Sequence, residues 1–191
     1  LVWLDEDFTN DVAATLAGHP LVSEDDLERL TGYVAIGHTR YSTTGSSNLA
    51  NAQPIVSRGP NVELALAHNG NVINAQVLRL ELGEWGASFS ASTDSEVIAQ
   101  LLVHAPGENW KERVSYMMRR LQGAYSLTVL TKDMVMGIRD PRGVRPLCLG
   151  KLDGGWIIAS ESCALDHLGG QFIREIEPGE TVIIDERGVT S

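Results

Sequence analysis

Gly37-His38-Thr39-Arg40-Tyr41-Ser42-Thr43-Thr44-Gly45 is the stretch around which the rest of this sequence can be interpreted. It follows a short apolar run at residues 33–36, which predicts a buried strand. That strand would deliver Arg40 and a row of hydroxyl groups into a loop closed by Gly45. A guanidinium beside these hydroxyls suits bidentate capture of a carboxylate, although a lone arginine in a polar turn is more often simply exposed.

A second stretch, His68-Asn69-Gly70-Asn71, follows another strand-like run at residues 62–67. Asn-Gly usually marks a tight turn, because both residues tolerate positive φ, and we expect the strand to end there. The same pair can aim a side-chain amide and a backbone N–H at one point, and two such donors form an oxyanion hole. The residues alone leave both interpretations open.

A third stretch, Ser92-Thr93-Asp94-Ser95-Glu96, has the capping-box pattern, with Thr93 at the N-cap and Glu96 three residues later. Apolar residues follow, so the pattern predicts a helix. Asp94 would lie in the first turn, where the helix dipole favours an ionised carboxylate. Most aspartates at such positions are nothing more than helix-start residues.

The pattern of the remaining chain predicts helices first and then strands. Helices are predicted at 23–30, after Asn71 or Asn74, at 109–121 and, as a short element, at 162–168. Strands are predicted at 125–130, 134–138, 147–149, 156–159, 172–176 and 181–184, whereas 51–60, with two prolines, is expected to be a loop. Consecutive helices and consecutive hairpin strands indicate the α+β class.

Composition and charge exclude several classes of protein. The 191 residues are one domain's worth of chain, 43% hydrophobic and 21% charged, as in ordinary globular proteins. A net charge of −10 argues against a nucleic-acid partner. No apolar run is long enough for a bilayer and the start does not resemble a signal peptide. Two cysteines without metal-type spacing fit a cytoplasmic location.

Six motifs, in this order, resemble class II glutamine amidotransferase domains of the N-terminal-nucleophile type, above all those of the amidophosphoribosyltransferase family. They are Gly37 to Gly45, Asn51-Ala52-Gln53-Pro54, His68 to Asn71, Ser92 to Glu96, Arg139-Asp140-Pro141-Arg142-Gly143-Val144-Arg145-Pro146 and Ala159-Ser160-Glu161-Ser162. The resemblance extends from about Gly32 to the end. It implies a four-layer αββα sandwich, truncated at the N-terminus, with residues 1–191 as a single partial domain and 1–30 poorly assigned.

The resemblance also implies roles for particular residues. In the family an arginine holds the α-carboxylate of glutamine and an aspartate holds its α-ammonium group, which correspond here to Arg40 and Asp94. Asn69 and Gly70 would form the oxyanion hole. His68 is expected to be structural rather than a general base. The glutamine pocket would also be lined by Tyr41, Ser42, Thr43 and Thr44.

The nucleophile is where this sequence departs from the family pattern. The family's catalytic cysteine is the mature N-terminal residue and its own amine acts as the base. This sequence begins with Leu1 and has no cysteine before Cys148. We expect Cys148 to be buried and inert, and Cys163, with His167 four residues on, gives only a weak dyad or metal signal. The chain as given is therefore expected to be inactive.

The expected function is glutamine hydrolysis that supplies ammonia to phosphoribosyl diphosphate. The partners would be L-glutamine, a phosphoribosyltransferase domain absent from this sequence and, in the full enzyme, further copies in a homo-oligomer. No cofactor is expected in this domain, and Mg²⁺ only with the absent one. Residues 139–146 could bind phosphate or another domain, although a solvated loop is the commoner role. The alternatives are a domain of the glucosamine 6-phosphate synthase type and a non-catalytic glutamine-binding or scaffold module.

Overall fold

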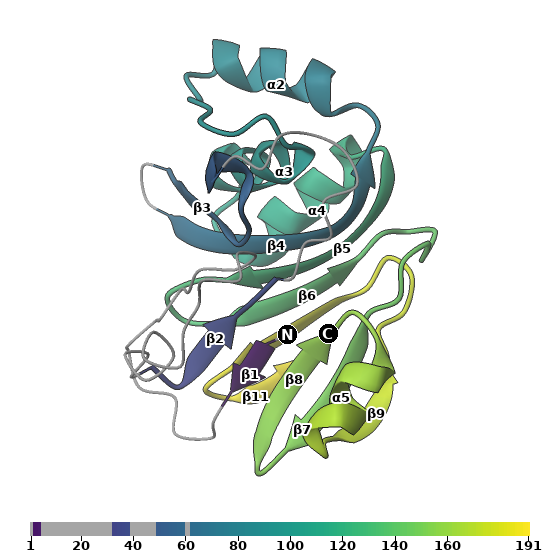
Figure 1. Cartoon of the computed structure of the whole chain (residues 1–191). Helices are drawn as coiled ribbons and strands as arrows, with labels where there is room; N and C mark the ends of the chain where they lie inside the picture. The colour runs from purple at the N-terminus through teal and green to yellow at the C-terminus, as the bar shows by residue number, and fades with distance from the viewer. Residues whose placement is uncertain (1, 5–31, 39–48, 60–61) are drawn as a thin grey trace.

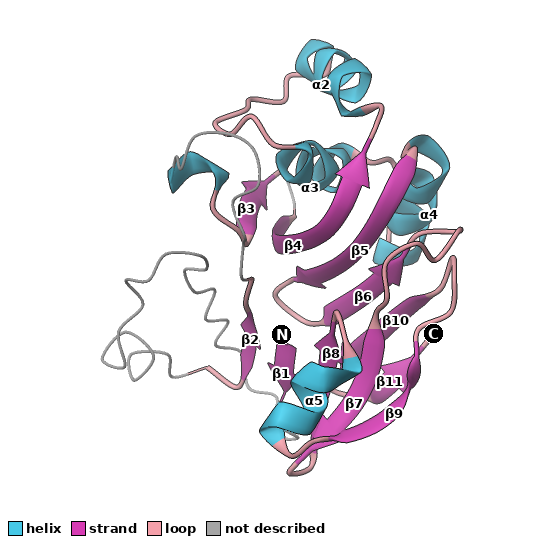
Figure 2. Cartoon of the chain, turned by 45° about the vertical axis from the view of Figure 1, so that its right-hand side comes forward, coloured by secondary structure: helices cyan, strands magenta, loops and turns pink. Residues whose placement is uncertain are grey.

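The computed structural model describes residues 2–4, 32–38, 49–59 and 62–191, and it confirms the α+β class (Figures 1 and 2). Two antiparallel sheets are stacked on one another, with helices on their outer sides. The helix expected at 23–30 and the arginine loop from Thr39 onward lie outside the described residues.

Within the described ranges, one sheet has six strands and the other has five. The first runs in the order β11 (Gly188–Thr190), β10 (Thr181–Asp185), β6 (Val135–Arg139), β5 (Gly123–Leu130), β4 (Glu63–Val72) and β3 (Ile55–Arg58). The second runs in the order β2 (Val34–Ile36), β1 (Val2–Leu4), β8 (Gly155–Ala159), β7 (Cys148–Leu152) and β9 (Gln171–Glu175).

The helices cover the outer faces of the two sheets. The six-stranded sheet carries α3 (Asp94–His104) and α4 (Trp110–Arg120), and α2 (Ala75–Glu84) packs on α3. The five-stranded sheet carries α5 (Ser162–Leu168), and a 3₁₀ turn, η1 (Leu49–Asn51), precedes β3. Three apolar cores separate these layers: one under α2 to α4, one between the sheets and one under α5. No helix in the described part of the chain is long and apolar enough to span a bilayer.

The sequence of β4 shows why the two sheets can stack closely. Leu64 and Leu66 face the helices, whereas Ala65 and Ala67 face the second sheet, as the period of two requires. Small residues on the inner side keep the sheets close. At Gly137 of β6 an added Cβ would lie only 2.9 Å from the Cδ1 of Ile158 in the second sheet.

Strand β4 is longer than the sequence predicted. The prediction that it ends in an Asn69-Gly70 turn is wrong, because β4 stays paired with β5 from Ala65 opposite Leu130 to Val72 opposite Gly123. Pairing with a neighbouring strand supplies hydrogen bonds that a local turn preference cannot match. The loop predicted at 51–60 likewise contains β3, which begins directly after Pro54.

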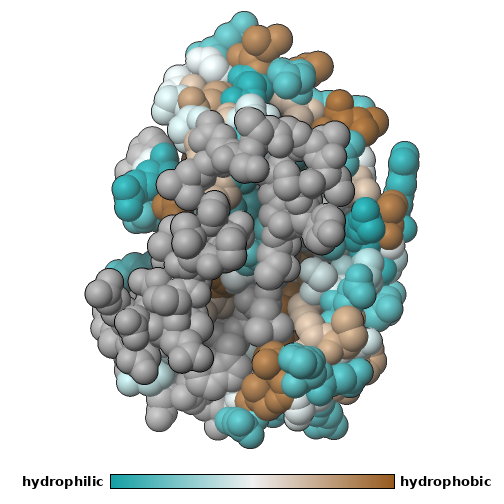
Figure 3. All heavy atoms as spheres, viewed as in Figure 1, coloured by the Kyte–Doolittle hydropathy of each residue, from teal (hydrophilic) through white to brown (hydrophobic). Residues whose placement is uncertain are grey.

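The helices agree with prediction more closely. Helix α2 buries Leu78 and Leu82. Ile73, Val77 and Leu80 are 73%, 66% and 74% exposed. Apolar atoms accordingly lie at the surface at the top of the molecule, where α2 is found (Figure 3).

Candidate functional site

Asn69 and Gly70 lie near the end of β4, where the strand emerges from the core. Asn69 is half-buried and Gly70 is exposed. Their partners across the ladder are Ser126 and Tyr125 of β5. Because alternate residues of a strand face opposite sides, Asn69 lies on the same side of the sheet as Ala67, toward the second sheet.

The position of Gly70 admits no side chain. Its φ is +156°, and an added Cβ would lie 2.1 Å from the carbonyl oxygen of Ala124 and 2.8 Å from Nε2 of His68. Both distances are far below van der Waals contact. Close packing and the backbone conformation therefore both require a glycine at position 70.

Asp94 is brought to the same end of β4 by helix α3, of which it is the first residue. Its Oδ2 accepts a hydrogen bond of 2.9 Å from the backbone N–H of Val72. Its Oδ1 lies 3.8 Å from Nδ1 of His68, and the side chain is 24% exposed. Asp94, although distant in sequence, is thus bonded to β4 two residues beyond Gly70.

The start of α3 is held by more than a capping box. Thr93 Oγ1 accepts the N–H of Glu96 at 3.4 Å, as predicted. The Glu96 carboxylate does not reach back to Thr93; it accepts hydrogen bonds of 2.7 and 2.9 Å from the N–H and Oγ of Ser90 and one of 2.9 Å from the N–H of Ala91. The loop before the helix is therefore fixed, and Asp94 with it.

A pocket of about 340 Å³ opens beside Asp94, between α2, the end of β4 and the start of α3. Its polar wall includes Asn51, whose Oδ1 accepts the N–H of Ser92 at 3.1 Å. Arg79 also lines it, but the guanidinium already donates to the carbonyl of Thr93 at 3.1 Å and stacks on Phe89, 4.2 Å from the ring centre.

Two residues that sequence reasoning left without a site role lie beneath this end of β4. Gln53 Oε1 accepts the N–H of His68 at 2.7 Å, which extends the sheet with a side chain. His68 is 4% exposed, and its Nδ1 lies 3.2 Å from Oγ of Ser95. Burial lowers the pKa of His68, and the charge of Asp94 and the backbone of Ala124 offset this only in part. The period of two along β4 places His68 on the helix side and could have indicated its burial.

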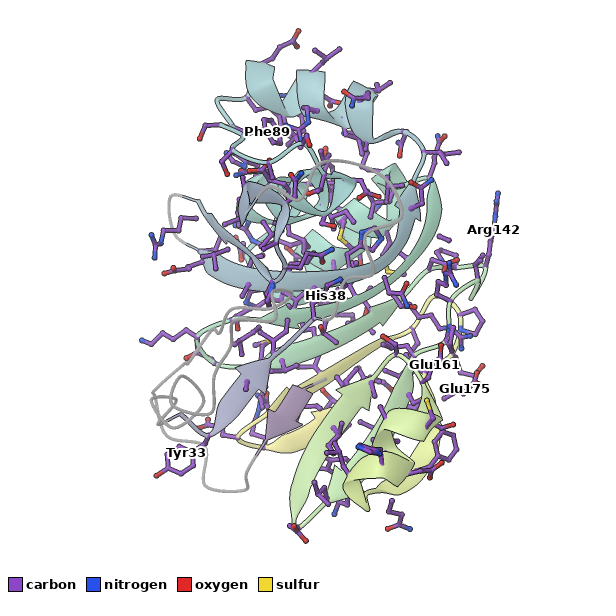
Figure 4. The ribbon with its side chains drawn as sticks, viewed as in Figure 1. Tyr33, His38, Phe89, Arg142, Glu161 and Glu175 are labelled. Atoms are coloured by element: carbon purple, nitrogen blue, oxygen red, sulfur yellow. The ribbon has the colours of Figure 1, made fainter. Side chains whose placement is uncertain are left out.

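The predicted carboxylate-binding residue, Arg40, and the neighbouring Tyr41, Ser42, Thr43 and Thr44 lie outside the described residues. The described chain reaches His38, which follows β2. Strand β2 contacts both β4 and β5, and in Figure 4 His38 lies over these strands. Arg40 is two residues further along.

Neither cysteine faces Asn69. Cys148 is buried in β7 and packs with Leu165 of α5, on the outer side of the second sheet. Burial and the charge of Glu175 raise its pKa, so the thiol remains protonated, and the prediction that it is buried is confirmed. Cys163 is exposed on α5. Within the described ranges no group of three His, Cys, Asp or Glu residues could hold a metal ion.

In the arginine-rich run at 139–146 only the first two residues are buried, and residues 141–146 are exposed or half-buried, as expected of a solvated loop. Arg139 is 7% exposed and Asp140 fully buried, because Arg139 Nη1 donates to the carbonyl of Ile176 at 2.6 Å and Asp140 Oδ2 accepts the N–H of Val144 at 3.1 Å. Arg142 instead extends away from the molecule (Figure 4). Hydrogen bonds made by its two buried residues therefore hold this loop in place.

Comparison with known proteins identifies relatives of this arrangement. A family model described as a glutamine amidotransferase domain matches residues 38–167. The amidophosphoribosyltransferase of Archaeoglobus fulgidus is 47% identical over 169 residues, 86% of this chain and 36% of the relative. That of Staphylococcus aureus strain MRSA252 is 41% identical over 171 residues, 88% of this chain and 35% of the relative.

A solved structure is similar in fold as well as in sequence. It is a glutamine phosphoribosylpyrophosphate (PRPP) amidotransferase from B. subtilis complexed with ADP and GMP, with a TM-score of 0.79 and 37% identity, covering 86% of this chain and 36% of that one. The present chain thus spans about a third of the length of the relatives it matches.

Proposed function

This chain belongs to the family of glutamine amidotransferase domains, and we propose on that premise that it binds L-glutamine and supplies the oxyanion hole for hydrolysis of the side-chain amide. One observation carries the proposal. The Asp94 carboxylate at the start of α3 accepts a hydrogen bond from the N–H of Val72, two residues beyond Gly70 at the end of β4.

The substrate's α-ammonium group would bind Asp94. Oδ2 of that carboxylate takes one backbone hydrogen bond, and the side chain remains 24% exposed. A carboxylate can accept about four hydrogen bonds, so it has capacity left for an ammonium group. Arg40 would bind the α-carboxylate, because an amino acid is distinguished from a plain amide by one cation and one anion set apart.

Asn69 and Gly70 would stabilise the negative charge that develops on the amide oxygen during attack. An Asn side-chain amide and a backbone N–H, preorganised by neighbouring strands, act before the reaction begins and therefore cost little reorganisation. The pairing of both residues with β5 supports such rigidity.

We propose further that the attacking thiol is neither Cys148 nor Cys163. Cys148 packs against α5 and Cys163 lies on α5, so both are on the outer side of the second sheet. Asn69 lies on the other side of that sheet, in the space between the two sheets. A family-type N-terminal cysteine would have to be supplied, and these 191 residues alone should not release ammonia from glutamine. Removing the nucleophile of a hydrolase costs about a million-fold in rate.

For the whole enzyme we propose the activity that its relatives' names describe, with ammonia passed to phosphoribosyl diphosphate. The layer order of helices, sheet, sheet and helix supports the N-terminal-nucleophile hydrolase type of fold. In this proposal the domain itself needs no cofactor, and L-glutamine is its only substrate.

Calorimetric titration tests the binding half of the proposal. The 191-residue chain should bind L-glutamine and lose detectable affinity on Asp94→Asn or Arg40→Ala, since a contact to a charged group contributes about 1.5–3 kcal/mol. Asp166→Asn, which changes an exposed carboxylate on α5, is the matched control and should bind as wild type does. Equal affinity of wild type and Asp94→Asn would remove the assignment.

A further inference from the structure

His68 lies between the two halves of the proposed site. On one side its Nε2 would be 2.8 Å from a Cβ placed on Gly70, so the imidazole packs directly against that residue. On the other side its Nδ1 lies 3.2 Å from Ser95 Oγ and 3.8 Å from Asp94 Oδ1. The backbone at His68 is fixed as well, because Gln53 bonds both its N–H and its carbonyl, at 2.7 and 3.4 Å.

We propose that His68 is a positioning residue whose neutral imidazole supports Gly70 and leaves the charge of Asp94 for a ligand ammonium group. Protonation of His68 and binding of that ammonium group would then exclude one another. The inference rests on the proposed function, since it assumes that the ligand of Asp94 is the α-ammonium group of an amino acid.

The charges around His68 favour this role. Asp94 is the nearest carboxylate, and imidazolium at 3.8 Å would neutralise it. Tyr125 of β5 shares the helix side of the sheet, but burial and then the charge of Asp140 raise its pKa to about 12, so it stays neutral. Arg79 and Glu96 lie 3.6 Å apart and compensate one another.

Burial decides which state His68 adopts without ligand. Desolvation lowers its pKa more than Asp94 raises it, so the neutral form prevails at pH 7. Within the described ranges, Asp94 then has no positively charged partner. A bound ammonium group would cancel the one charge that favours imidazolium, and by reciprocity imidazolium would weaken ammonium binding by the same factor.

Nitrogen NMR of the imidazole rings in the ¹⁵N-labelled 191-residue chain tests this coupling directly. The His68 signals, assigned by their loss in His68→Asn, should titrate at lower pH when L-glutamine saturates the chain. Coupling between two sites typically amounts to about 5- to 150-fold in affinity. Glutaramate, which has the carboxylate and the amide but no ammonium group, should leave the titration of His68 unchanged. A shift of equal size with both compounds would overturn the proposal.

Two variants separate this inference from the proposed function. In Asp94→Asn without ligand, His68 should titrate at lower pH than in wild type, and an unchanged titration would overturn the link between the two residues whatever the ligand is. His68→Asn keeps a polar group near Nδ1 but cannot titrate. Whatever its affinity for L-glutamine at pH 8, it should lose the weakening toward pH 5.5 that His68 causes, since the measured coupling belongs to that residue.

Failure of wild type to bind L-glutamine at any pH would overturn the proposed function together with the ammonium half of this inference. Binding by wild type with the same pH dependence in His68→Asn would overturn the inference alone.

Discussion

The buried imidazole of His68 should make the stability of the fold depend on pH. Burial holds its pKa below 6.5 in the folded state, whereas the unfolded chain titrates near 6.5. Below pH 6.5 the unfolded state therefore binds more protons, and stability falls as the pH falls until the folded pKa is reached. We expect urea denaturation to give a smaller free energy of unfolding at pH 5.5 than at 7.5, by up to ~1.4 kcal/mol per pH unit.

His68→Asn is the control for this pH effect, because it retains a polar side chain without a titrating group. Its free energy of unfolding should fall less between pH 7.5 and 5.5 than that of wild type. Parallel curves for the two proteins would show that other groups cause the change.

Gly70 and Gly83 should respond in opposite ways to alanine. At Gly70 the new Cβ would meet the Ala124 carbonyl at 2.1 Å and the backbone has positive φ, so Gly70→Ala should cost at least ~1–3 kcal/mol. At Gly83, inside α2, an added Cβ meets nothing within 4 Å. Gly83→Ala should stabilise by roughly 0.5–1 kcal/mol. Urea midpoints measure both, and a neutral Gly70→Ala would contradict the described packing.

Among the elements, the start of α3 depends more on Glu96 than on its N-cap. Thr93→Ala removes one long cap contact of 3.4 Å and should cost about 1 kcal/mol. Glu96→Ala leaves the N–H groups of Ser90 and Ala91 without acceptors and Arg79 without its carboxylate. It should cost about 2–5 kcal/mol by thermal or urea unfolding. Similar losses for the two variants would contradict this order.

Helices could be predicted from sequence where their start signals are local. α4 begins after Asn109, whose side chain accepts the N–H of Glu112 at 3.0 Å, and α3 follows Thr93, both as predicted. The end of β4 could not be predicted, because Asn-Gly is a local turn signal and the pairing with β5 that overrides it is distant in sequence. Strand β3 was missed because the two prolines of residues 51–60 favoured a loop, although the strand pairs with the adjacent β4.

The candidate site was predicted in its residue types more than in its geometry. The motifs singled out Asn69, Gly70 and Asp94; the structure pairs the first two with β5 and bonds Asp94 to Val72, two residues beyond Gly70. The supporting contacts of Gln53 and His68 were not foreseen, since a hydrogen bond between a side chain and a distant strand leaves no periodic trace in the sequence. The roles of all five residues in binding and catalysis remain predictions.

At the scale of the whole molecule, Arg139 joins the two sheets. From β6 its guanidinium donates to the carbonyls of Ile176 and Arg145 at 2.6 and 2.9 Å and to Glu175 of β9 at 3.1 Å. Arg139→Lys keeps the charge but loses the planar fork that makes these contacts. We expect a loss of about 1–3 kcal/mol in the free energy of unfolding, measured with urea.

Arg142→Lys is the matched control for Arg139→Lys. Arg142 lies three residues further along the chain, in the loop after β6; it is exposed and points away from the molecule (Figure 4). Its substitution should change stability by no more than about 0.5 kcal/mol. Equal effects of the two substitutions would show that the buried guanidinium does not join the sheets.

The alternation of large and small residues along β4 also limits how the molecule can come apart. Leu66 belongs to the core under the helices, while its neighbour Ala67 belongs to the core between the sheets. A chain segment shared in this way cannot leave one core without exposing the other. The described layers should therefore melt as one cooperative unit rather than as two separable halves, and the proposed site at the end of β4 should remain intact until the whole domain unfolds.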